Sequence, residues 1–90
     1  MRILMAEDDL HVARYVKIGL EAEHFAVDLV ADGLEAQNLA IQNDYDILIL
    51  DIELAGELDG FQVLRFVRVK KPCVPVIILS GQSSTEARVR

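Results

Sequence analysis

Short, largely apolar runs alternate with amphipathic segments along this chain. Four runs have the length of a strand: Ile3–Ala6, Phe25–Ala31, Asp46–Leu50 and Val74–Leu79. Ile3–Ala6 and Val74–Leu79 are continuous enough to be typical of strands covered on both faces of a sheet, whereas Phe25–Ala31 alternates. Strands that alternate with helices imply parallel strands, joined by right-handed crossovers, with helices on both faces. The sequence therefore predicts an α/β fold with a doubly wound parallel sheet.

The segments between these runs predict the helices. The first helix follows an N-cap at Asp8 or Asp9, and it carries Val12, Val16 and Leu20 at helical spacing. Two further helices are expected over Leu34–Gln42 and Phe61–Val69, and Pro72 stops the second of these. Thr85–Arg90 is expected to form the first turns of another helix. Periodicity alone does not give the order of the strands.

Composition limits the class of protein. Ninety residues make one small domain, and a formal net charge of −6 argues against a nucleic-acid surface on this segment. The single cysteine, Cys73, excludes an internal disulfide. The apolar runs are too short to span a bilayer, and acidic residues follow the first run at once, unlike a signal peptide. We therefore expect a cytoplasmic protein that binds a cation or a basic partner.

Polar side chains follow three of the four predicted strands. Glu7 and Asp8 follow the first, Asp51 the third and Ser80 the fourth. Ligands of doubly wound sheets bind beyond the carboxyl ends of the strands, where these side chains would converge. Carboxylates at such short distances from one another all stay ionised only if a cation lies among them. A site of oxygen ligands without His or Cys suits Mg²⁺. A carboxylate beside Mg²⁺ is a plausible nucleophile for phosphoryl transfer, and the Ser80 hydroxyl is a donor for a phosphoryl oxygen.

Three motifs resemble those of response-regulator receiver domains. ILMAEDD at Ile3–Asp9 looks like the acidic pair that opens these domains, and DILILD at Asp46–Asp51 looks like their third strand with the phospho-acceptor last. VPVIILSG at Val74–Gly81 looks like their fourth strand and its hydroxyl residue. FAVDLVADGLEAQNLA at Phe25–Ala40 is most similar to receivers attached to winged-helix DNA-binding domains. The resemblance covers all 90 residues.

The resemblance implies a role for each matching residue. Glu7, Asp8 and Asp51 would hold Mg²⁺, Glu53 would add its backbone carbonyl, and Ser80 would move toward the phosphoryl group. Asp51 would accept that group from a phosphohistidine on a sensor histidine kinase, and the receiver would catalyse both this transfer and the later hydrolysis. The parent protein would regulate transcription, binding DNA through a further C-terminal domain.

The resemblance also implies a flavodoxin-like sheet of strand order 2-1-3-4-5. The sequence departs from the usual pattern of the family in two places. Ala55 stands where the family usually has proline, and Gly60 comes one residue late, so the loop after Asp51 is longer. The sequence also stops before a fifth strand, its lysine and a fifth helix, and Lys70 and Lys71 lie at the wrong edge to replace that lysine. We therefore predict an incomplete receiver over residues 1–90. Its fourth strand, Val74–Leu79, would be an open edge that pairs or swaps in a homodimer or larger oligomer.

Three other functions compete with a phospho-accepting receiver. A degenerate receiver would act only as a protein-interaction module. A Mg²⁺-dependent phosphatase with Asp51 as nucleophile commonly has a second aspartate two residues later, where this chain has Glu53. A dinucleotide-binding module needs a glycine-rich turn after the first strand, but the segment there is acidic and free of glycine.

Overall fold

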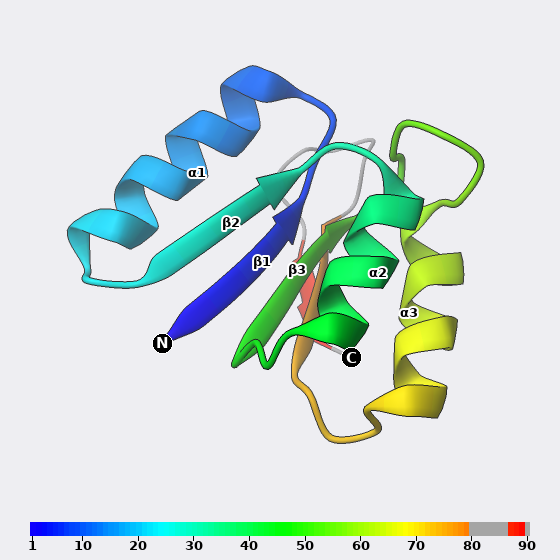
Figure 1. Ribbon diagram of the computed structural model, residues 1–90. Helices are drawn as coiled ribbons and strands as arrows, with labels where there is room; N and C mark the ends of the chain where they lie inside the picture. The colour runs from blue at the N-terminus through cyan, green and yellow to red at the C-terminus, as the bar shows by residue number, and fades with distance from the viewer. Residues whose placement is uncertain (80–86, 90) are drawn as a thin grey trace.

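The computed structural model describes residues 1–79 and 87–89, and it contains the predicted alternation of strands and helices (Figure 1). The strands are β1 (Arg2–Ala6), β2 (Ala26–Val30), β3 (Ile47–Asp51), β4 (Val76–Leu79) and β5 (Ala87–Val89). The helices are α1 (Leu10–Ala22), α2 (Gly33–Gln42) and α3 (Gly60–Lys70). No helix among the described residues is long and apolar enough to cross a membrane.

The sheet has the strand order β2-β1-β3-β4-β5, and its first four strands are parallel. In register, Ile3 of β1 lies between Val27 of β2 and Ile47 of β3. The carboxyl ends of these strands lie together at the upper side of Figure 1, which we call the carboxyl edge. The opposite side, where β1 and β3 begin, is the amino edge. The doubly wound parallel sheet is thus confirmed, in the order that the resemblance implies for its first four strands.

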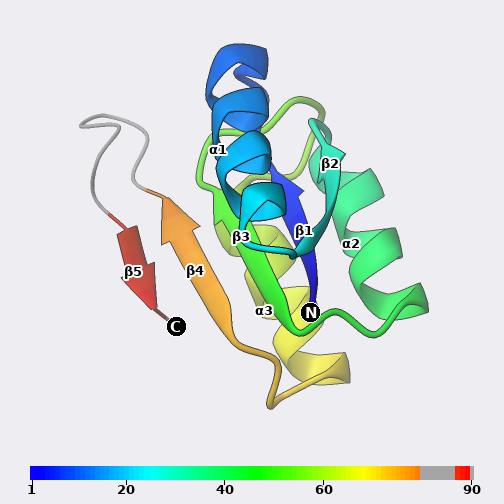
Figure 2. The same cartoon turned by 90° about the vertical axis from the view of Figure 1, so that its left-hand side faces the viewer.

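The end of the chain differs from the prediction. Ala87–Val89 is not helical but forms β5, which runs antiparallel to β4, with Ala87 opposite Leu79 and Val89 opposite Ile77 (Figure 2). A helix must form a costly first turn before it gains stability, whereas this segment satisfies free N–H and C=O groups on the side of β4. The helix expected over Thr85–Arg90 is therefore wrong for residues 87–89. Thr85, Glu86 and Arg90 lie outside the described residues.

This pairing also corrects the prediction of an open edge at β4. Ile77, Ile78 and Leu79 are paired on both sides, with β3 and with β5. Because β5 is antiparallel, it is not the fifth parallel strand of the receiver sheet. An oligomer formed by pairing directly on β4 therefore loses its structural basis.

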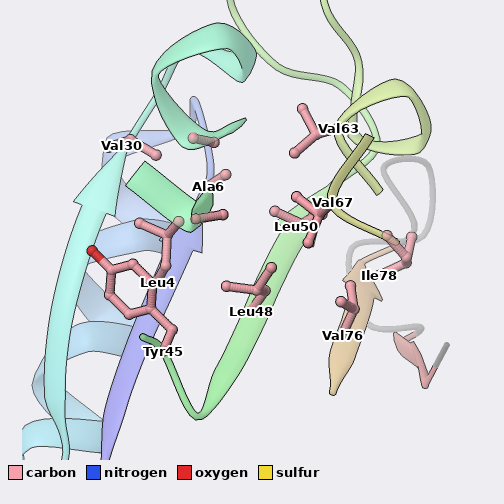
Figure 3. Packing of buried hydrophobic residues seen from close by; sticks show 12 residues of the cluster. Leu4, Ala6, Val30, Tyr45, Leu48, Leu50, Val63, Val67, Val76 and Ile78 are labelled. Carbon is pink, nitrogen blue, oxygen red and sulfur yellow. The ribbon is translucent and has the colours of Figure 1, made fainter. Parts of the chain in front are cut away.

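Helices cover both faces of the sheet, with α1 on one face and α2 and α3 on the other (Figures 1 and 2). Side chains of a strand alternate between the faces. In β1, Ile3 and Met5 accordingly join the core on the α1 side, and Leu4 and Ala6 join the opposite core. Figure 3 shows this second core between the sheet and α2 and α3. Its buried members are Leu4, Ala6, Val30, Ala36, Ala40, Tyr45, Leu48, Leu50, Val63, Val67, Val76 and Ile78.

Candidate metal centre

The carboxyl edge brings Glu7, Asp8 and Asp51 together. Each residue offers a carboxylate oxygen, and these oxygens all lie within 4.8 Å of one another. Glu7 is only 6% exposed and Asp51 only 7% exposed, whereas Asp8 is exposed. The convergence of these three side chains is the one expected from the sequence. It arises because β1 and β3 are neighbours whose ends are in register, with Ala6 opposite Leu50.

Local hydrogen bonds hold the segment after β1. The amide of Glu7 donates to the carbonyl oxygen of Val30 at 2.9 Å, which continues the pairing of β1 with β2. Asp9 is the N-cap of α1, since its carboxylate accepts from the amides of His11 and Val12. The choice between Asp8 and Asp9 as N-cap is thereby settled. It leaves the carboxylate of Asp8 for the acidic group.

The electrostatics of the group are unfavourable without a cation. The pKa of Glu7 is raised from 4.5 to about 7, first by burial and further by contact with the carboxylate of Asp51. One hydrogen bond opposes this rise, because the Asp9 amide donates to Glu7 Oε1 at 3.0 Å. Within the described residues, the buried Oδ1 of Asp51 has no hydrogen-bond partner. A buried carboxylate oxygen without a donor costs free energy unless something else binds it.

These residues fit a bound Mg²⁺. Over residues 1–79 and 87–89, the group consists of carboxylates alone, the hard ligands that Mg²⁺ takes in proteins, and one of their oxygens is buried without a hydrogen-bond partner. Glu53 lies two residues after Asp51 on the exposed loop that leads to α3. Ser80, the predicted partner of the phosphoryl group, lies outside the described residues.

Lys71 takes no part in this centre. Its Nζ donates to the carbonyl oxygen of Asn43 at 2.6 Å and lies 3.4 Å from Asp44 Oδ1, both in the segment that leads into β3 at the amino edge. The prediction that Lys70 and Lys71 lie at the opposite edge of the sheet agrees with this position of Lys71.

The loop between β3 and α3 is fastened to the turn before α2, which the sequence analysis did not anticipate. The Ala55 amide donates to Ala31 O at 3.0 Å, and the Gly33 amide donates to Ala55 O at 3.1 Å. Asp32 and Ala55 form an isolated parallel bridge there. The sequence signal was Asp32-Gly33, which indicated a turn but not what packs against it. The longer loop is thus anchored at the position where the family's proline is replaced.

The chain matches the family model described as "Response regulator receiver domain" over residues 3–90. It is 40% identical over 90 residues to the transcriptional regulatory protein HprR of Escherichia coli (strain K12). That match covers all of this chain but 40% of HprR, so the chain spans about two fifths of the relative's length.

The chain is also similar to solved structures of receiver domains and response regulators. The receiver domain of the sensor histidine kinase PA1611 from Pseudomonas aeruginosa PAO1, which holds a magnesium ion in its active-site cleft, is 30% identical with a TM-score of 0.85. The match covers 93% of this chain and 70% of that one. The response regulator TrrA from Thermotoga maritima, in complex with Mg²⁺-BeF, is 33% identical with a TM-score of 0.84, over 91% and 70% of the two chains.

The fold, the acidic group at its carboxyl edge and the match over residues 3–90 lead to one assignment. This chain belongs to the receiver domains of two-component response regulators.

Proposed function

We propose that Asp51 is the phospho-acceptor of this receiver, and that Glu7, Asp8 and Asp51 bind the Mg²⁺ that the reaction needs. The observation that carries the proposal is that the buried Oδ1 of Asp51, within a group of three carboxylates, has no hydrogen-bond partner in the part of the chain that the structure describes. Nearby acids cannot all remain ionised in a buried place without a cation. The backbone carbonyl of Glu53 is a further ligand in this proposal, and the Ser80 hydroxyl contacts the phosphoryl group.

In the proposed reaction, a carboxylate oxygen of Asp51 attacks the phosphorus of a phosphohistidine. A P–O bond forms, the P–N bond breaks, and the released imidazole takes up a proton. The product is an acyl phosphate, which water later hydrolyses back to the carboxylate and inorganic phosphate. Bound Mg²⁺ would supply positive charge to the phosphoryl oxygens. The end of β3 is held within the sheet, and it therefore keeps the carboxylate of Asp51 in a fixed position for the reaction.

Calorimetric titration with Mg²⁺ tests the metal site. The wild type should bind one ion weakly, because Mg²⁺ keeps several of its waters, and Asp8→Asn should weaken binding. Asp44→Asn is the matched control: it changes the charge equally at a fully exposed carboxylate of the amino edge. Equal affinity for wild type and Asp8→Asn would contradict the site. A wild type that binds no Mg²⁺ would favour a receiver that acts only as an interaction module.

Phosphorylation of the full-length protein tests the acceptor. A small phosphodonor with Mg²⁺ should add one phosphoryl group that hydroxylamine removes, as it does from acyl phosphates. Asp51→Asn should abolish the labelling. Label that survives this substitution would show that Asp51 is not the acceptor.

The remaining partners follow from the resemblance. The donor would be a sensor histidine kinase in the cytoplasm, and the output would be DNA binding through a winged-helix domain in the same protein. Sequencing the gene downstream of the codon for Arg90 tests the output, and an unrelated domain there would contradict it. The homodimer or larger oligomer expected from the sequence stays a proposal without the open edge at β4, and sedimentation equilibrium at micromolar concentration tests it.

A further inference from the structure

We propose that Gly60 and Gly33 are positioning residues for the acidic centre, because each lets a helix begin in direct contact with the segment that carries the centre. That segment is Asp51 and the β3–α3 loop (residues 52–59). The inference rests on the proposed function, since it concerns how the Mg²⁺ site and the acceptor are held in place. It assigns this role to two residues that carry no side chain.

Gly60 lies against the backbone of the proposed acceptor itself. A Cβ atom at Gly60 would overlap the carbonyl oxygen of Asp51, and it would come within 2.9 Å of the Asp51 carbonyl carbon and 3.0 Å of Ile52 Cα. The Gly60 amide also donates to Ile52 O at 2.8 Å. All these atoms belong to the backbone, so no change of rotamer could make room. A side chain at Gly60 must therefore move the backbone of Asp51 or the start of α3.

The start of α3 is poorly able to move. Asp59 and Gln62 form a capping box, in which each side chain accepts from the other residue's amide at 2.8 Å. Val63 and Val67, on the following turns, are fully buried in the core beneath the sheet. Because α3 is fixed by its cap and its core contacts, a side chain at Gly60 would displace Asp51.

Gly33 makes the corresponding contact at the other end of the β3–α3 loop. A Cβ atom there would overlap the carbonyl oxygen of Leu58 and would come within 2.9 Å of Leu58 Cβ. Gly33 begins α2 directly after its N-cap Asp32, as Gly60 begins α3 after Asp59. The loop is thus packed against the first residue of two helices, and one of its hydrogen bonds comes from the Gly33 amide.

The consequence for the site is positional rather than chemical. Ligands that are misplaced by a fraction of an ångström bind a metal more weakly, and changes in the residues that support ligands commonly cost ~10–100-fold in affinity. Replacing a helical glycine by alanine otherwise tends to stabilise a protein, where the backbone permits it. Measuring Mg²⁺ affinity and the free energy of unfolding for the same variants therefore distinguishes a positioning role from a general structural one. A positioning residue changes the affinity by more than its effect on stability explains.

The test compares four variants of this chain by calorimetric Mg²⁺ titration and urea denaturation, at a temperature where each is folded. Gly60→Ala should lower Mg²⁺ affinity about tenfold, and Gly33→Ala should lower it about threefold because it acts on the far end of the loop. Gly19→Ala is the matched glycine control, since a Cβ there meets nothing within 4 Å. Val67→Ala is the control for lost stability, since it opens a cavity two turns along α3 from the site.

Both controls should bind Mg²⁺ within about twofold of wild type, although Val67→Ala is clearly destabilised. If Gly60→Ala binds Mg²⁺ as well as Gly19→Ala does, the inference is wrong while the metal site stands. If affinity instead follows stability across all four variants, Gly60 has only a structural role. A wild type that binds no Mg²⁺ would overturn the proposed function instead.

A measurement on the wild type covers the case in which Gly60→Ala does not fold. Linkage is reciprocal, so a contact that positions the ligands is itself stabilised when Mg²⁺ binds. Saturating Mg²⁺ should slow hydrogen exchange at the amides of Gly33, Ala55 and Gly60, which all bond within this contact region. The amides of Asn43 and Asp46 at the amino edge are the internal control. Equal protection at both edges would overturn the inference.

Discussion

The acidic residues at the two edges of the sheet have opposite surroundings: hydrogen-bond donors and a cation at one edge, and other carboxylates at the other. Tyr45 and Arg2, at the amino edge, both reach Asp28 in the middle of β2: Tyr45 donates its hydroxyl to Asp28 Oδ2 at 2.7 Å, and Arg2 Nη2 lies 3.2 Å from the same oxygen. The Arg2 amide donates to Asp46 Oδ2 at 2.7 Å, and its guanidinium lies 4.9 Å from the centre of the Tyr45 ring. At the carboxyl edge, Glu7, Asp8 and Asp51 face one another, and Asp51 Oδ1 has no partner among the described residues.

The pKa values follow this difference. The Tyr45 hydroxyl, followed by Arg2, holds the pKa of Asp28 below its usual 3.8. Burial and the Asp28 carboxylate raise the pKa of Tyr45 to about 12, so that it remains a donor. Burial and Asp51 instead raise the pKa of Glu7 to about 7. One edge therefore stabilises the fold with its charges, and the other brings together charges that oppose folding.

The largest effect is the expected difference in stability between two variants, each of which neutralises one acid at one edge. In the absence of Mg²⁺, Asp51→Asn should raise the free energy of unfolding by about 1 kcal/mol, because it removes one of three crowded charges. Asp28→Asn should lower it by about 1 kcal/mol, because the hydroxyl of Tyr45 and the guanidinium of Arg2 lose an anionic acceptor. Urea denaturation in a chelator measures both.

Each of these two substitutions changes the net charge by the same amount, so a general effect of the charge of −6 cancels between them. The two changes in stability should differ by about 2 kcal/mol and have opposite signs. Changes of the same sign would mean that the two edges do not differ as described.

The next effect is expected from Mg²⁺ itself. At a free Mg²⁺ concentration about ten times the dissociation constant, binding should raise the free energy of unfolding by about 1.4 kcal/mol. Asp51→Asn should lose most of this gain, whereas Asp44→Asn, with its fully exposed carboxylate at the amino edge, should keep it. Denaturation midpoints with and without Mg²⁺ give the answer, and a gain that survives in Asp51→Asn would place the ion elsewhere.

Much of the fold was predictable because strands covered on both faces carry continuous apolar runs. β1 and β3 bury nearly every residue, so Ile3–Ala6 and Asp46–Leu50 gave strong signals. The end of the chain was not predictable from its own residues. Ala87–Val89 becomes a strand because β4 offers it a partner, and a local pattern does not contain that information.

The acidic centre was predictable as a convergence of residues but not in its detail. Strand ends that share an edge bring Glu7, Asp8 and Asp51 together whatever the loops do. Asp8 and Asp9 have the same side chain, so their residue type does not show which of them caps the helix. The path of the backbone in the structure shows that Asp9 caps α1. The contact of Gly60 with Asp51 and the bridge between Asp32 and Ala55 depend on how distant segments pack, which spacing does not reveal.

A smaller effect is expected from pH. Because the folded state raises the pKa of Glu7 from 4.5 to about 7, it binds more protons than the unfolded state between these values. Its contribution to stability is fully present below pH 4.5 and is lost as the pH rises through 7. We expect a loss of the order of 1 kcal/mol over this window in a chelator.

Glu7→Gln should flatten the dependence between pH 4.5 and 7, and urea denaturation across that range measures it. The contribution of Asp28 lies in a different window. Its pKa is lowered on folding, so its stabilisation is present above 3.8 and is lost only as the pH falls further. A wild-type stability that does not fall between pH 4.5 and 7 would contradict the raised pKa of Glu7.

The smallest effect on stability is expected from salt. Salt should affect the two edges differently, because their charged side chains differ in exposure. The side chains of Arg2 and Asp28 are 48% and 51% exposed, so water and ions screen this pair and Arg2→Met should cost only about 0.5 kcal/mol at low ionic strength. At ~0.5 M KCl the Debye length is only a few ångströms, and the cost should approach zero.

Glu7 and Asp51 are 6% and 7% exposed, so the gain from Asp51→Asn should fall much less over the same range of KCl. Urea denaturation of the wild type and both variants at two KCl concentrations compares these changes directly. If salt removes the Asp51→Asn gain as completely as the Arg2→Met loss, the acids at the carboxyl edge repel one another through solvent. Burial would then not be the reason for their mutual repulsion, and the proposed cation would not be needed to offset it.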